Sequence, residues 1–237
     1  GLPTLSLVSV RTAKSDAGHT ITMNVTQSPP ARNMSLPITI ETDGPPVRAV
    51  LEMIPDKERY EIYVEANPKS VTIDPDFHAL RNLATSELPA TLRDAMRAKS
   101  MAVFASGSGD VAVDFLVKEL FSKAEEVSQA AMTADTPDAD AIAVIGDLRE
   151  VLANRSRFFD HPLPAQVARG QIRVWVEKDA LDRLWLFVAA DAPERIEDDL
   201  ANIRFYGRQS WLIIAPQTPP QSGRWSPVSP RIKLTTD

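Results

Sequence analysis

The stretch His-Thr-Ile-Thr-Met-Asn-Val-Thr-Gln, residues 19–27, decides the fold of the N-terminal part of the chain. Its apolar side chains, Ile21, Met23 and Val25, alternate strictly with polar ones. A period of two puts all three on one face, so the sequence predicts a strand with one buried face and one solvent face. Such a strand needs partners that cover its buried face.

Short segments of the same extended character surround this strand. Turn residues such as Asp16-Ala17-Gly18 and Pro29-Pro30 separate them. The further segments are residues 4–13, 36–41, 47–54, 59–65 and 70–74. Short strands at a spacing of roughly 8–12 residues, with turns between them, are typical of antiparallel sandwiches. The sequence therefore predicts an N-terminal antiparallel β-sandwich over residues 1–76.

After residue 76 the pattern changes to helical spacing and continuous apolar runs. A helical connector is expected over residues 77–98, and an α/β domain over residues 99–237 that ends in an irregular C-terminal tail. Buried strands are expected at residues 101–105, 141–145, 171–176, 184–189 and 209–215, and helices at residues 111–131, 148–158 and 193–203. This alternation predicts a three-layer α/β domain with a mainly parallel sheet, and an α+β multidomain chain as a whole.

The composition excludes several classes of function. Twenty-six basic and 32 acidic residues give a net charge of -6, which argues against a general nucleic-acid binder. The absence of cysteine excludes disulfides, thiolate metal sites and cysteine nucleophiles. No window reaches the roughly 18 apolar residues of a membrane span. These observations predict a protein with two domains and no span in this chain.

The turn after residues 101–105 is the most suggestive local feature. Gly107-Ser108-Gly109-Asp110-Val111-Ala112 fits a loose G-x-G-x-x-A pattern that opens a helix, where free amides suit a phosphate. Against this, Asp110 would repel the anion and serves equally well as an N-cap, and Asp147 comes too late to bind a ribose. The ligand-site candidates are Ser106, Ser108, Gly109, Asp110 and Asp147, with Asp191 expected near the same edge of the sheet.

Other chemistries find less support. Ser106 or Ser108, Asp147 or Asp191, and His161 could form a hydrolase triad, but the G-x-S-x-G elbow is absent. Metal ligation has only isolated candidates, His19 and His78, the latter beside Asp74 and Asp76. Carbohydrate stacking would need exposed tryptophans, whereas Trp175, Trp185 and Trp211 lie in apolar strand runs and only Trp225 lies outside them. No catalytic residue, metal ligand or cofactor is therefore assigned.

The first 92 residues nevertheless resemble a known module. The quoted stretches are Gly1-Leu2-Pro3-Thr4-Leu5-Ser6-Leu7, Ile21-Thr22-Met23-Asn24-Val25-Thr26-Gln27-Ser28, Leu36-Pro37-Ile38-Thr39-Ile40, Val71-Thr72-Ile73-Asp74-Pro75-Asp76, Leu80-Arg81 and Glu87-Leu88-Pro89-Ala90-Thr91-Leu92. Together they resemble the small β-sandwich that follows the catalytic domain in zinc aminopeptidases of the membrane alanyl aminopeptidase (gluzincin) type. The family's zinc-binding H-E-x-x-H…E and its G-x-M-E-N motif are absent from this chain.

The resemblance implies a role for the chain. It is expected to be the non-catalytic C-terminal region of a larger metallopeptidase-like protein, cut at Gly1, with the upstream catalytic domain as its partner and no enzymatic activity of its own. Family habit points to the bacterial periplasm or cell envelope. The alternative is a ligand- or nucleotide-binding α/β domain that uses the Gly107-Ser108-Gly109 turn.

Overall fold

The computed structural model describes residues 1–54, 58–105, 110–121, 124–129, 137–179 and 181–234. The chain divides into two compact units. The sandwich unit comprises Gly1–Leu88 together with Pro227–Asp237, and the mixed-sheet unit comprises Pro89–Ser226. None of the helices in the described part of the chain has the length and apolar character that a membrane crossing requires.

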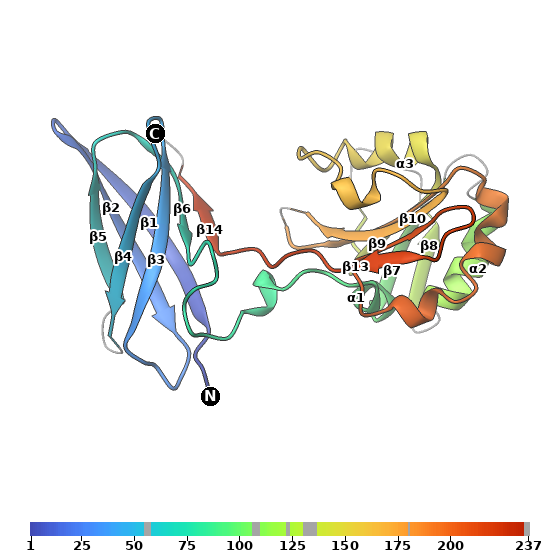
Figure 1. The fold of residues 1–237 in the computed structure, drawn as a ribbon, viewed down its shortest axis with the longest axis horizontal. Coiled ribbons are helices and arrows are strands. Elements are labelled where there is room, and N and C mark those ends of the chain that lie inside the picture. Colours follow the sequence, from blue (N-terminus) through green and yellow to red (C-terminus); the bar gives the residue numbers. More distant parts are fainter. Residues whose placement is uncertain (55–57, 106–109, 122–123, 130–136, 180, 235–237) are drawn as a thin grey trace. The chain divides into compact units, whose positions relative to one another are not determined.

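The sandwich unit consists of two antiparallel sheets (Figure 1). One has the order β1-β2-β5 and the other β14-β6-β3-β4. Their strands are β1 (Leu5–Ser15), β2 (Gly18–Gln27), β3 (Met34–Thr42), β4 (Val47–Met53), β5 (Arg59–Val64), β6 (Pro68–Ile73) and β14 (Arg231–Lys233). Strands are present at each segment expected before residue 76, because alternating apolar side chains bury one face of each.

The core of the sandwich unit takes side chains from both sheets. On β2, Ile21, Met23 and Val25 are fully buried, as the alternation predicts. On the other sheet, Leu36, Ile38 and Ile40 of β3 and Val71 and Ile73 of β6 belong to the same cluster. The two inward faces therefore share one hydrophobic core.

The end of the chain returns to the sandwich unit. Strand β14, drawn in red in Figure 1, pairs antiparallel with β6. Just before it, the Val228 amide donates a hydrogen bond of 3.0 Å to the Glu87 carbonyl oxygen. The mixed-sheet unit is therefore an insertion whose entry and exit segments are hydrogen-bonded neighbours within the sandwich unit.

The mixed-sheet unit is built on a seven-stranded sheet of order β13-β12-β10-β11-β9-β7-β8. Its strands are β7 (Ser100–Ala105), β8 (Glu126–Gln129), β9 (Ala141–Asp147), β10 (Ile172–Lys178), β11 (Leu184–Ala190), β12 (Trp211–Ile214) and β13 (Gln221–Gly223). The β7–β8, β7–β9 and β9–β11 pairings are parallel, and the β10–β11, β10–β12 and β12–β13 pairings are antiparallel. The sheet is thus mixed.

Short helices cover this sheet. α1 (Leu92–Met96), α2 (Asp110–Leu120) and α4 (Ile196–Asp199) contribute to one hydrophobic cluster with side chains of β10 and β11. α3 (Leu148–Arg155) belongs to a second cluster, which contains alternate side chains of the same strands, including Trp175 and Trp185. Because strand side chains alternate between faces, the two clusters lie on opposite faces of the sheet.

The expected fold class is wrong. The chain is mostly β, with 43% strand and 18% helix, and the described residues contain only four α-helices. The mixed-sheet unit is therefore not the expected three-layer α/β domain with a mainly parallel sheet. Five residues join β10 to β11, which is too short for a parallel crossover and gives a hairpin instead.

Two of the expected helices differ most from the prediction. The pattern at residues 111–131 predicts one long helix, but α2 ends at Leu120 and β8 follows at Glu126–Gln129 on the edge of the sheet. Residues 193–203 form a 3₁₀ turn at Pro193–Arg195 and the four-residue α4. Apolar spacing of three or four also suits short turns that each bury one side chain, as Ile196 and Leu200 do here.

Candidate functional site

The topology of the mixed-sheet unit gathers several strand ends at one edge. β7, β9 and β11 are parallel neighbours, so their carboxyl ends meet there. Asp147 is the last residue of β9 and pairs with Ala190, and Asp191 follows directly after β11. Of the other predicted ligand residues, Ser106, Ser108 and Gly109 lie outside the described residues, and Asp110 begins α2.

Asp147 has a structural role. Its side chain accepts a hydrogen bond of 3.0 Å from the Glu150 amide and so caps the N-terminus of α3. A carboxylate at this position satisfies an otherwise free amide and interacts favourably with the helix dipole. The cap accounts for Asp147 without a ligand.

His161 is exposed, and it lies beside a buried ion pair between Arg155 and Glu177. Nε of Arg155 donates to Oε1 of Glu177 at 2.7 Å, and Nε1 of Trp175 donates to the same oxygen at 2.7 Å. Nε2 of His161 lies 3.3 Å from Oε2 of Glu177. Glu177 pairs with Trp185 near the start of β11, whereas Asp191 follows the end of that strand. His161 is therefore held at the opposite end of the sheet from the acids proposed for a triad.

Asp74 and two of the tryptophans from the other hypotheses are likewise engaged. Oδ1 of Asp74 accepts the amides of His78 and Ala79, and its Oδ2 accepts Nε of Arg81. Trp175 and Trp185 are fully buried. Within the described residues, no group of three or more His, Asp or Glu side chains is arranged to hold a metal ion.

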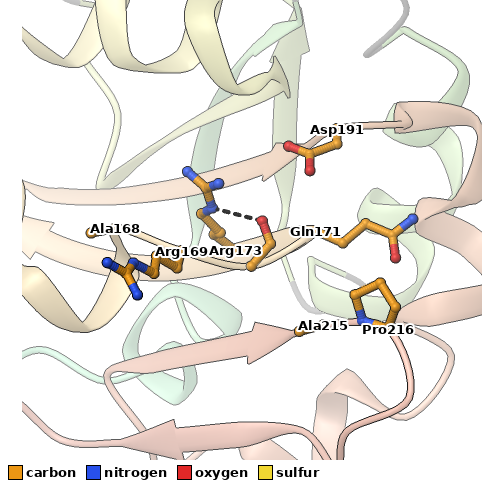
Figure 2. Close-up of a pocket in the computed structure, with 8 residues that line it drawn as sticks. Ala168, Arg169, Gln171, Arg173, Asp191, Ala215 and Pro216 are labelled. Atoms are coloured by element: carbon orange, nitrogen blue, oxygen red, sulfur yellow. Dashed lines mark hydrogen bonds between the residues drawn. The ribbon is translucent and has the colours of Figure 1, made fainter.

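A depression lies at the edge where the carboxyl ends gather (Figure 2). Its volume is about 550 Å³. It is lined by the segment before β10, by the residues that follow β11 and β12, and by one side chain of β10 itself: Ala168, Arg169, Gly170, Gln171, Arg173, Asp191, Ala215 and Pro216. Three adjacent strands thus contribute to one hollow.

Backbone contacts fix the walls of this depression. The Gln171 amide donates to the Ile214 carbonyl at 2.8 Å, and the Asp191 amide donates to the Gln171 carbonyl at 2.9 Å. Gly170 has a φ of +133°, and a Cβ there would lie 2.4 Å from Cγ2 of Ile213. Only glycine fits this position without strain. The lining is therefore held in place before any ligand arrives.

Arg173 is the notable residue of the depression. It is 8% exposed, and its Nε donates a hydrogen bond of 3.0 Å to the Gly170 carbonyl oxygen. Its side chain makes no other hydrogen bond and no ion pair with the described residues. Burial lowers the pKa of Arg173, and the negative charge of Asp191 opposes this effect only in part. A buried cation without a paired anion lowers the stability of the folded state, because the charge has lost its hydration.

Reasoning from the sequence missed Arg173. Residues 171–176 were recognised as a strand, Gln-Ile-Arg-Val-Trp-Val, but its arginine was not singled out. The available signal was a single charged side chain inside an otherwise apolar run, where burial is expected. The sequence places Asp191 at this edge of the sheet, as the structure does. Arg173 reaches the same edge because its strand, β10, runs antiparallel to β11.

Comparison with known proteins gives no relative: no family model, no curated protein and no solved structure matches the chain.

Proposed function

We propose that this chain is the non-catalytic accessory region of a larger aminopeptidase-like metallopeptidase, with a structural and interaction role. The proposal rests on the resemblance of residues 1–92 and on the geometry of the residues that carry it. The upstream catalytic domain of the same polypeptide is the proposed partner. Any peptidase activity would reside in that domain.

One observation carries this proposal. The first residues of the resembling stretch contact Asn82, about eighty positions later in the same stretch, within the sandwich unit. Thr4 forms a parallel bridge with Asn82, the Asn82 amide donates to the Pro3 carbonyl at 2.8 Å, and Nδ2 of Asn82 donates to the Leu2 carbonyl at 2.8 Å. A domain attached before Gly1 would therefore join the sandwich at a fixed segment of backbone rather than through a free linker.

A buried charge cluster stiffens the same region. Arg81 Nε donates to Asp74 Oδ2 at 2.7 Å, and its Nη1 donates to Glu87 Oε2 at 2.8 Å. Nη2 of Arg81 lies 2.7 Å from Oε1 of Glu87, close enough for charge compensation although not aligned as a hydrogen bond. We call Asp74, Arg81 and Glu87 the arginine clamp. It lies next to Asn82, so the joint rests on a rigid support.

The activity test uses the purified chain with added zinc and an aminoacyl reporter substrate. The proposal predicts turnover no faster than in the buffer control. Robust turnover that a chelator abolishes would refute it, because the chain would then bind zinc and catalyse hydrolysis by itself.

The joint is tested in the larger polypeptide that the proposal requires. Asn82→Ala removes the side-chain hydrogen bond to Leu2 and is expected to lower the temperature at which aminopeptidase activity is lost on heating. Asn33→Ala, at an exposed position of the sandwich unit, is the matched control and should leave that temperature unchanged. Equal behaviour of the two variants, or a natural polypeptide without a zinc-binding domain, contradicts the proposal.

A further inference from the structure

The depression around Arg173 has the features of a binding site, and these do not depend on the accessory role proposed above. The guanidinium of Arg173 is buried and uses one N–H group on the Gly170 carbonyl. Its two Nη atoms have no hydrogen-bond partner among the described residues, yet they are not sealed off, because Arg173 lines the depression. Figure 2 shows this guanidinium with its one hydrogen bond, to the Gly170 carbonyl oxygen, and with the Asp191 carboxylate nearby.

The position of Asp191 limits what the depression can hold. Asp191 lines the depression together with Arg173, but no ion pair within 4.0 Å joins the two side chains. Asp191 and Arg169 are both exposed, whereas Arg173 is buried. The lining therefore carries two positive charges and one negative charge. A monoanion balances this set, while a dianion would be repelled by Asp191.

The geometry of guanidinium favours a planar partner. Two parallel N–H groups match the two oxygens of a carboxylate and form a pair of short, charge-assisted hydrogen bonds. The partner would also replace the solvation that burial removes from Arg173. Next to it, the side-chain amide of Gln171 offers both a donor and an acceptor for a second polar group of the ligand.

We propose that the depression bounded by Gly170, Gln171, Arg173 and Asp191 is a binding site for the carboxylate of a small organic monoanion. Arg173 is its anchor. The fixed backbone of Gly170 and Gln171 holds the anchor in position, and Asp191 selects against ligands of higher negative charge.

The experiment is an NMR titration of the ¹⁵N-labelled chain with sodium acetate, at constant ionic strength maintained with sodium chloride. Saturable shifts are expected for the amides of residues 170–173 and Asp191. Arg173→Gln should weaken acetate binding by at least about tenfold, because charge-assisted hydrogen bonds are lost. Arg97→Gln removes the same charge from an exposed position of the same unit and should leave the affinity unchanged.

A second variant keeps the site testable if Arg173→Gln fails to fold. Asp191→Asn retains the anchor, removes the repulsive charge and should strengthen acetate binding by about threefold. Inorganic phosphate serves as the competing probe and should bind more weakly than acetate. The proposal is overturned by shifts that chloride alone reproduces, by an Arg173→Gln variant that binds acetate as the native chain does, by an Asp191→Asn variant with unchanged or weaker binding, or by tighter binding of phosphate.

Discussion

Arg81 of the sandwich unit and Arg173 of the mixed-sheet unit, both buried, illustrate opposite uses of the same side chain. Arg81 contacts two buried carboxylates, and although burial lowers its pKa, Glu87 and Asp74 together raise it above the ordinary value. Arg173 has only a carbonyl oxygen and a more distant carboxylate, and burial lowers its pKa. The positive charge of Arg81 is compensated by the carboxylates of Asp74 and Glu87. Arg173 retains N–H groups that donate to no described residue. We therefore place a ligand at Arg173 and not at the arginine clamp.

The sharpest test of this comparison is removal of Arg81. Arg81→Met leaves Asp74 and Glu87 buried and uncompensated, and should lower the free energy of unfolding of the sandwich unit by about 3–5 kcal/mol. All four tryptophans lie in the mixed-sheet unit, so far-UV circular dichroism in urea should show the loss while tryptophan fluorescence does not. Arg59→Met, which removes an ion pair with a 70% exposed arginine, is the control and should cost at most about 1 kcal/mol. Equal effects of the two substitutions would contradict the structural role of the clamp.

The next largest effect is expected at the wall of the depression. Gly170→Ala places a Cβ 2.4 Å from Ile213 at a φ of +133°, and should destabilise the mixed-sheet unit by about 1–3 kcal/mol. Urea unfolding followed by tryptophan fluorescence measures this. Gly207→Ala, whose Cβ would meet no atom closer than 3.5 Å, should change the stability little. If Gly170→Ala is as mild as Gly207→Ala, the wall is not rigid.

Asp179, at the β10–β11 turn, gives a pH-dependent test in the same unit. Burial raises its pKa, but hydrogen bonds from Trp185, Arg183 and Leu181 outweigh this and lower it below the ordinary 3.8. A carboxylate whose pKa is lowered by folding stabilises the folded state at pH values above 3.8, the ordinary pKa. This stabilisation is lost as the pH falls through the lowered pKa of the folded state. Asp179→Asn should cost about 1 kcal/mol between pH 5 and pH 7, and the difference from the native chain should shrink below about pH 3.8. A difference that stays constant down to pH 2.5 would contradict this.

The smallest stability effect is expected at Arg173 itself. Arg173→Met removes a buried charge that lacks a close anion, so the free energy of unfolding should change by no more than about 1 kcal/mol in either direction. Fluorescence-monitored urea unfolding measures it. A loss as large as that of Arg81→Met would show that Arg173 has a structural role like that of the arginine clamp, and the contrast between the two arginines would disappear.

The strands were largely predictable, and the residues show why. In residues 19–27 and 36–41 every second side chain is apolar, and a period of two has one structural meaning. The continuous runs at residues 101–105 and 141–145 also form strands, since they are too short for buried helices. The order of apolar and polar residues in the sequence was sufficient to predict these strands.

Three features were beyond the reach of the sequence pattern. The helix expected at residues 111–131 ends at Leu120 because an edge position beside β7 is available to Glu126–Gln129, a tertiary effect. The three residues of β14 lie in a segment rich in Pro, Ser and Thr, and their pairing with β6 depends on a contact about 160 residues away. The depression depends on β10 running against β11, which brings Arg173 and Asp191 to the same end of the sheet.

The hydrogen bond between Glu87 and Val228 has a consequence for how the gene could be rearranged. Because the two crossing points of the mixed-sheet unit are adjacent, residues 89–226 occupy the place that a short surface loop would fill in a smaller protein. A designer could replace them with a few glycines and serines without stretching the backbone, and could graft another insert between the same two anchor points. The sandwich unit can thus accept different inserted domains at this position. The adjacency of the two crossing points would also have made the insertion of a domain easy in evolution.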